Sequence, residues 1–176
     1  MKRAILAFLS VAAAAIACST LTTSADYDPS TDFSRYKTWD LKQDKSIDNA
    51  LLARRIETAV TAELAKKGMT RNTSNPDFWV AVHGRMSKQT QINTYDTGWG
   101  YGYGWRYGGG MSTSTVTEVP VGTLIVDIVD AGKKDLVWRG TASDTLNPEA
   151  SPEKKEANLQ EAMAKLLANF PPPKKG

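Results

Sequence analysis

Apolar residues recur along the chain with two different spacings, and these spacings predict the secondary structure. Over residues 46–67 they lie three and four positions apart, which is typical of a helix with one buried face. Asp48 or Ser46 can cap this helix, and Gly68 can end it. Residues 152–170 show the same spacing after a proline suited to a first turn. The two apolar stripes are Leu52, Ile56, Ala59, Val60 and Leu64, then Leu159, Met163, Leu166 and Leu167.

Alternation of apolar and polar residues predicts strands elsewhere. It appears in residues 36–40 and 78–91, and residues 111–119 are a polar, β-prone run typical of an exposed strand. Residues 122–129 and 135–145 predict a hairpin around a polar turn. In residues 78–91 one face carries Phe78, Val80, Val82 and Met86, and the other carries Trp79, Ala81, His83 and Arg85.

The element order β-α-β-β-β-α predicts an α+β fold in which two helices pack on one face of a mostly antiparallel, four-stranded sheet. The 176 residues suit one domain. We expect that domain to span residues 32–170. A polar tether rich in turn-forming residues, 18–31, should precede it, and a flexible tail, 171–176, should follow it.

The register of the predicted hairpin brings two charges together. Leu124, Val126 and Ile128 must share a face with Leu136, Trp138 and Ala142 if one side of the hairpin is buried. This pairing places Asp127 opposite Arg139, or two residues from it, on the outer face. The pair is interpreted first as a cross-strand salt bridge, worth well under ~1 kcal/mol if exposed. A ligand contact that also includes His83 is the alternative.

The N-terminal residues predict an export signal. Lys2 and Arg3 precede an apolar stretch that ends at Cys18, too short for a membrane span of about 20 residues. Residues 15–18, Ala-Ile-Ala-Cys, resemble the bacterial lipobox, in which the cysteine receives a lipid and becomes the mature N-terminus. We therefore expect residues 1–17 to be a lipoprotein signal peptide and Cys18 to be the lipidation site. The alternative is an ordinary signal peptide, with Cys18 removed or left as a free thiol.

Glycine and aromatic residues alternate over residues 95–110. A connection of this length is usually functional or disordered. Tyr and Trp side chains combine apolar area with polar groups, which suits contact with proteins, sugars or a membrane interface. No parallel strand precedes these glycines and no helix follows them, so the segment does not predict a nucleotide site. The partner-binding candidates are Trp99, Tyr101, Tyr103, Trp105 and Tyr107; the alternative is a disordered loop without a role.

Composition excludes several functions. One cysteine and one histidine allow neither a disulfide framework nor a Cys/His metal cage. The net charge of +3 approaches zero once Lys2 and Arg3 are removed, so the sequence does not predict nucleic-acid binding. Catalytic motifs of hydrolases, kinases and metalloproteases are absent. We therefore expect no enzyme activity and no cofactor; a hydrolase whose nucleophile and base meet only in the fold is a distant third hypothesis.

Several segments together resemble the bacterial lipoprotein family known as domain of unknown function 4136. The matching segments are residues 26–29, 32–39, 55–60, 67–68, 76–78, 122–130, 136–140 and 170–172. The resemblance implies an α+β envelope lipoprotein and supplies no catalytic residue. The expected function is thus a non-catalytic binding or assembly module on the periplasmic side of the outer membrane. The alternative is a small-ligand or envelope-glycan binding protein that uses the outer face of the sheet.

Overall fold

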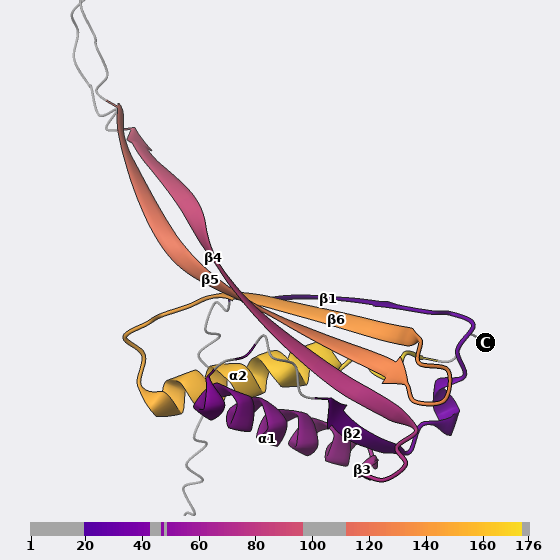
Figure 1. Ribbon diagram of the computed structural model, residues 1–176. Helices are drawn as coiled ribbons and strands as arrows, with labels where there is room; N and C mark the ends of the chain where they lie inside the picture. Colours follow the sequence, from indigo (N-terminus) through magenta and orange to yellow (C-terminus); the bar gives the residue numbers. More distant parts are fainter. Residues whose placement is uncertain (1–19, 43–46, 48, 97–111, 174–176) are drawn as a thin grey trace, which may run out of the picture.

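The computed structural model describes residues 20–42, 47, 49–96 and 112–173. They form six strands, two α-helices and one short 3-10 helix (Figure 1). In chain order these are β1 (Thr22–Tyr27), η1 (Phe33–Arg35), β2 (Thr38–Lys42), α1 (Ala50–Lys66), β3 (Thr70–Arg71), β4 (Phe78–Asp96), β5 (Ser112–Asp130), β6 (Leu136–Thr145) and α2 (Pro152–Leu167).

The α+β class with two helices is confirmed, but the expected sheet is wrong. The sheet has six strands in the order β1-β6-β5-β4-β2-β3 and is mixed, because β2 runs parallel to both β3 and β4. The parallel pair arises because α1 is a crossover connection between β2 and β4. Both helices lie on the same side of the sheet (Figure 1).

Part of the expected tether is a strand. Thr22–Tyr27 is β1, which pairs antiparallel with β6 from Thr22–Ser143 to Tyr27–Trp138. Its sequence is polar because β1 is an edge strand whose side chains are almost all exposed, so it carries no hydrophobic alternation. The expected signal peptide and Cys18 lie outside the described residues.

The two helices bury the apolar stripes that their spacing predicted, with two exceptions. Leu52 is 38% exposed and Leu159 is half-buried, whereas the other seven members of the two stripes are buried. The caps differ in detail, since Asn49 and not Asp48 or Ser46 accepts the first backbone N–H groups of α1. Gly68 ends the helix with a positive φ of 74°. In α2, Ser151 is the cap and the helix ends at Leu167.

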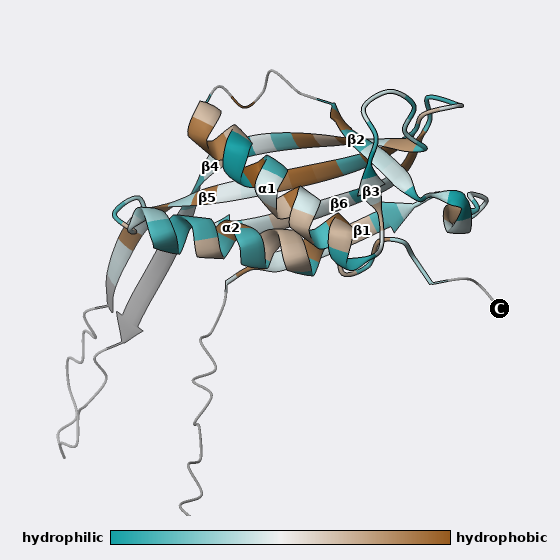
Figure 2. Cartoon of the chain, turned by 90° about the horizontal axis from the view of Figure 1, so that it is seen from below, coloured by the Kyte–Doolittle hydropathy of each residue, from teal (hydrophilic) through white to brown (hydrophobic). Residues whose placement is uncertain are grey.

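The core lies between the helices and the inner face of the sheet, where the central strands are most hydrophobic (Figure 2). An aromatic cluster closes it at the C-terminal end of α2. The Phe170 ring lies 5.4–6.1 Å, between centroids, from the rings of Phe33, Phe78 and Trp138. Phe170 is fully buried, so the expected flexible tail begins only after a residue that the core holds in place.

The hairpin of β5 and β6 has the predicted register except near its turn. Asp127 pairs with Arg139, Ile128 with Trp138 and Leu124 with Ala142. A register shift after Ile128 then pairs Val129 with Leu136 and leaves Val137 as an extra residue. Because of this shift Val137 is buried and Leu136 is exposed, so the expectation that Leu136 faces the core is wrong.

Strands β4 and β5 extend well beyond the rest of the sheet. They pair without a register shift from Phe78–Asp130 to Asp96–Ser112. In contrast, β2 follows β4 only to Ala81, and β6 follows β5 only to Val121. The remainder, residues 86–96 and 112–120, projects from the sheet as a two-stranded ribbon, here called the arm (Figure 1).

Candidate functional site

The structure brings the three residues of the predicted ligand-binding group together on the outer face of the sheet. Arg139 donates from Nε to Asp127 Oδ1 and from Nη2 to Oδ2, each at 2.6 Å. His83 Nε2 lies 3.3 Å from Asp127 Oδ2. Adjacent strands supply the three side chains, since Asp127 on β5 lies between Arg139 on β6 and the β4 residues.

The Asp127 carboxylate is more enclosed than an exposed salt bridge would be. Its side chain is 8% exposed, although the two described helices lie on the opposite face of the sheet. The carboxylate raises the pKa of the Arg139 guanidinium above its ordinary value, mainly through their hydrogen bonds. Both carboxylate oxygens are engaged by Arg139. The geometry therefore resembles a structural ion pair more than an acid available to a ligand.

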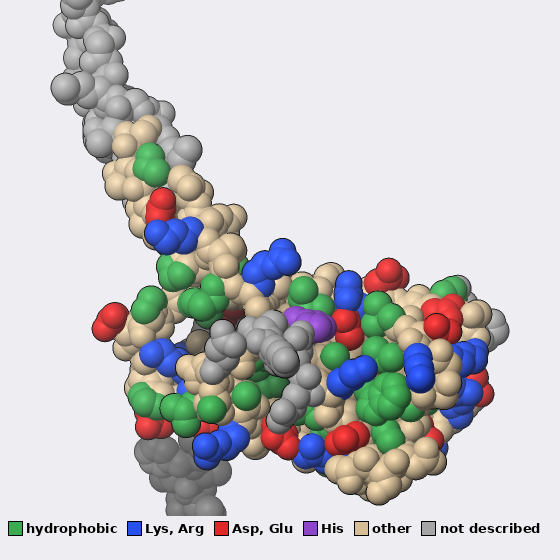
Figure 3. Space-filling model, in the orientation of Figure 1, with side chains coloured by type: hydrophobic (Ala, Val, Ile, Leu, Met, Phe, Trp, Pro, Cys, Tyr) green, Lys and Arg blue, Asp and Glu red, His purple; other side chains and the backbone are tan. Residues whose placement is uncertain are grey.

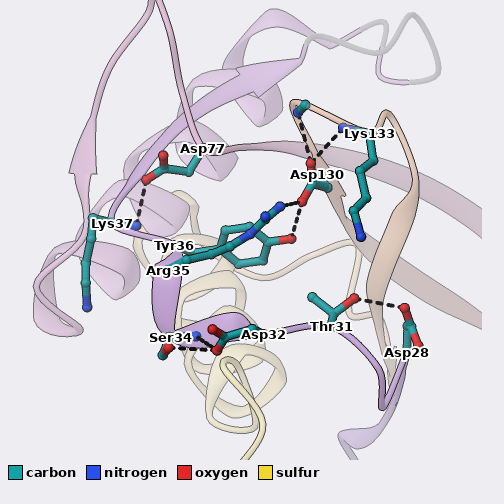
Figure 4. Close-up of polar contacts among 11 residues, drawn as sticks. Asp28, Thr31, Asp32, Ser34, Arg35, Tyr36, Lys37, Asp77, Asp130 and Lys133 are labelled. Carbon is teal, nitrogen blue, oxygen red and sulfur yellow. Dashed lines mark hydrogen bonds and ion pairs between the residues drawn. The ribbon is translucent and has the colours of Figure 1, made fainter.

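A second buried carboxylate, which the sequence analysis did not identify as a site, joins the β5–β6 turn to η1 (Figure 4). Asp130 is 1% exposed. Its Oδ2 accepts a hydrogen bond from the Tyr36 hydroxyl at 2.8 Å and pairs with the Arg35 guanidinium. Its Oδ1 accepts the backbone N–H groups of Gly132 and Lys133 at 2.9 and 2.8 Å. Burial raises the pKa of the Tyr36 phenol.

Asp77 stabilises the neighbouring loop in the same way. Its Oδ2 accepts the backbone N–H groups of Lys37 and Thr38, each at 2.8 Å, and these bonds lower the pKa of the carboxyl. Asp77, Asp130, Arg35 and Tyr36 all lie in segments that carry the family resemblance. Their contacts show that these motif residues hold loops together.

The arm is exposed wherever its first residues beyond the sheet are described. The side chains of residues 85–90 and 114–118 are all exposed. Met86 and Val116 are 75% and 63% exposed, because they continue the inner face of the sheet past the end of the helix layer. Most of the surface of the arm is uncharged and polar (Figure 3). Lys88 and Glu118 form an ion pair across it, at 3.0 Å.

Two hollows lie away from the outer-face group. One, of about 380 Å³, is lined by Tyr27, Phe33 and residues 171–173, among others. The other, of about 270 Å³, lies between β2 and α1, beside Leu41 and Ile56. Across the residues that the structure describes, no three His, Cys, Asp or Glu side chains converge as metal ligands would.

Two predicted sites lie outside the described residues. They are the lipidation site Cys18 and the aromatic group Trp99, Tyr101, Tyr103, Trp105 and Tyr107. Within the described part of the chain, neither helix has the length and hydrophobicity of a transmembrane segment.

Solved structures share this fold at low sequence identity. A PDZ domain protein from Parabacteroides distasonis matches with a TM-score of 0.58 and 16% identity, over 90% of this chain. The match covers 36% of that protein, so the present chain corresponds to about a third of it. Two structures of the PelC dodecamer from Paraburkholderia phytofirmans match with TM-scores of 0.51 and 0.50 and identities of 12% and 13%, over 84% of this chain and 95% of PelC.

No curated protein matches the sequence. A family model does match, and it spans residues 23–172, which is nearly all of the described chain. The matched range includes β1, the buried carboxylates Asp127 and Asp130, and the aromatic cluster around Phe170. The chain therefore belongs to the family described as Domain of unknown function (DUF4136).

Proposed function

We propose that this protein is a lipid-anchored component of the bacterial envelope that acts as a non-catalytic assembly module, with the arm as its contact surface. The observation that carries the proposal is the arm itself. Its side chains at residues 86–90 and 114–118 are exposed, and beyond the sheet its two strands pair only with each other among the described strands. Residues 97–111 join its two strands, and their aromatic side chains would add contact area.

The position of β1 supports an arrangement in which anchor and arm act together. Thr22, the first residue of β1, pairs with Ser143, which pairs with Thr123, which pairs with Arg85. This row lies at the end of the sheet from which the arm projects. Cys18 is four residues before Thr22, so a fully extended chain places it no more than about 14 Å away. A lipid on Cys18 would hold the base of the arm near the membrane surface.

The state of the buried acids favours a non-catalytic role. Asp127 and Asp130 each have both carboxylate oxygens engaged by protein donors. A general acid or base needs an oxygen within reach of a substrate. The structurally similar PelC is a dodecamer, and its fold is thus compatible with a role in assembly.

A small ligand or envelope glycan on the outer face is the second candidate. It is favoured by the convergence of His83 and Arg139, both partly exposed, on Asp127. Binding of soluble peptidoglycan fragments to the intact protein, and its loss in Arg139→Ala, would support this candidate over the first.

Two experiments test the first proposal. Cys18→Ala should move the protein out of the membrane fraction, and a variant that stays there would overturn the anchoring claim. A photocrosslinking residue at Val116 on the arm should give one dominant protein adduct in cells. The same probe at Leu136, an exposed apolar position at the opposite end of the sheet, is the matched control and should give none. Equal labelling from both positions would overturn the contact role of the arm.

A further inference from the structure

Exposed apolar side chains gather at one end of the domain. Among the described residues, all the large ones except Leu136 lie at the end of the sheet from which the arm projects, or on the arm itself. Figure 3 shows hydrophobic side chains at this end, below the arm. Leu51 is 62% exposed and lies off the buried stripe of α1, so packing of the helix does not require an apolar residue there. A group of apolar side chains that the fold leaves open is typical of a contact surface.

Three segments bring four of these side chains to the same end. Leu146 lies over Gly122, since a Cβ added to that glycine would be 3.0 Å from the Leu146 Cδ atoms. Gly122 pairs with Met86, so the two residues are neighbours on one face of the sheet. Helix α1 begins beside the same strand, because Ile47, just before it, lies 3.7 Å from a Cβ placed on Gly84. The four side chains, here called the apolar rim, are Leu51, Leu52, Met86 and Leu146.

The chain enters the domain at this rim. The hydroxyl of Thr20, the first described residue, donates to the carboxylate of Asp144. Asp144 pairs with Gly122, in the row of the sheet that also contains Met86. Cys18 is two residues before Thr20, so a fully extended chain places it no more than about 7 Å away. Acyl chains on Cys18 would be buried in the membrane, and so short a tether would keep the rim at the membrane surface.

We infer that the apolar rim rests on the bilayer that holds the Cys18 lipid, with its side chains among the headgroups and the first acyl carbons. Leucine and methionine side chains gain free energy when they leave water for an apolar environment. The acyl chains suffice to hold the protein in the membrane, so the rim sets the orientation of the domain and not its attachment. This inference rests on the proposed lipid anchor and deepens it by naming the residues that face the membrane.

Helix α1 provides a scale for measuring this orientation. Leu51 and Ala65 are both exposed and lie fourteen residues apart on the helix, which is about 21 Å along its axis. The C-terminal end of α1 leads to β3, which pairs with the first residues of β2, at the end of the sheet opposite the arm. A label at Leu51 should therefore lie at the lipid surface, and a label at Ala65 should lie in water.

Depth-dependent quenching tests the orientation. Leu51→Cys and Leu146→Cys are each labelled with an environment-sensitive fluorophore on the full-length lipidated protein, in vesicles of phosphatidylethanolamine and phosphatidylglycerol. Lipids that carry a nitroxide near the headgroup should quench these labels about twofold or more as strongly as a label on Ala65→Cys, the matched control on the same helix. Aqueous iodide should give the reverse order. Leu136→Cys, an exposed position at the far end of the sheet, should behave like Ala65→Cys.

The other outcomes separate the rim from the anchor. Labels that iodide quenches equally at all four positions, on protein that is bound to the vesicles, would overturn the inference and leave the lipid anchor standing. Protection of Leu51 and Leu146 from both quenchers would also contradict it, because a protein surface would then cover the rim. The unsubstituted chain has Cys18 as its one cysteine. If that chain takes up the label, its thiol is free, and both the anchor and the inference that rests on it fail.

Discussion

Asp127 and Arg139 form a two-hydrogen-bond ion pair in which the carboxylate is 8% exposed and the guanidinium 51% exposed. The buried Asp127 carboxylate therefore needs Arg139 as a hydrogen-bond partner, whereas water can reach the Arg139 side chain without Asp127. Arg139→Ala would leave a largely buried carboxylate with His83 as its remaining described partner, and this should destabilise the fold by about 1–3 kcal/mol. Chemical denaturation measures the loss.

Arg85→Ala is the matched control for that substitution. Arg85 lies on the same outer face but at the exposed base of the arm. Its removal should change the free energy of unfolding by no more than about 0.5 kcal/mol. Equal effects from the two substitutions would show that the ion pair has no special structural role.

Gly140 is a position where any side chain should disrupt the core. A Cβ added there would overlap the Trp138 ring and lie 2.7 Å from Leu166 Cδ2 of α2. Gly140→Ala should therefore destabilise the protein by about 1–3 kcal/mol through overpacking. At Gly122 the added Cβ would meet only the flexible, partly exposed Leu146 side chain, at 3.0 Å. Gly122→Ala should have a clearly smaller effect, and the reverse order of thermal midpoints would refute this packing.

Asp77 should make the fold sensitive to acid. Hydrogen bonds from Lys37 and Thr38 lower its pKa in the folded state below the ordinary value of 3.8. A carboxyl with a lowered pKa contributes stability above its unfolded pKa, and that contribution is lost as the pH falls through the folded pKa. The difference in unfolding free energy between the unsubstituted protein and Asp77→Asn should thus be constant near neutral pH and shrink below about pH 4. A difference that stays constant down to about pH 2 would contradict this role.

The arm should be dispensable for folding. Removing residues 89–94 together with 114–119 takes out six complete pairs, and so keeps the register and the faces of what remains. Because these residues pair only with one another among the described strands, the free energy of unfolding should change by no more than about 0.5 kcal/mol. A large loss in this short-arm variant would mean that the arm packs against the domain.

Local patterns in the sequence predicted the parts of the fold that depend on local periodicity. The helix stripes and the Asp127–Arg139 pairing both follow from a period that one buried face imposes. The same reasoning failed at Leu136, because an inserted residue reverses the alternation and leaves no mark in the pattern. It failed at β1 because an exposed edge strand has no apolar face to reveal it.

Contacts between distant segments were beyond this reasoning. Arg35 and Asp130 are 95 residues apart in the chain, and their contact depends on how η1 meets the β5–β6 turn. The sequence pattern also did not predict how far the arm extends beyond the sheet. Met86 continues the apolar alternation of β4, and nothing in the sequence shows that the helix layer ends before it.

The most direct test of the central claim is the size of the complex that contains this protein in gently solubilised membranes, compared between the unsubstituted chain and the short-arm variant. If the arm is the assembly surface, the short-arm variant should remain folded and in the membrane fraction, but it should migrate at the size of the single chain. A complex of unchanged size in the short-arm variant would contradict the account and place the contact elsewhere on the domain.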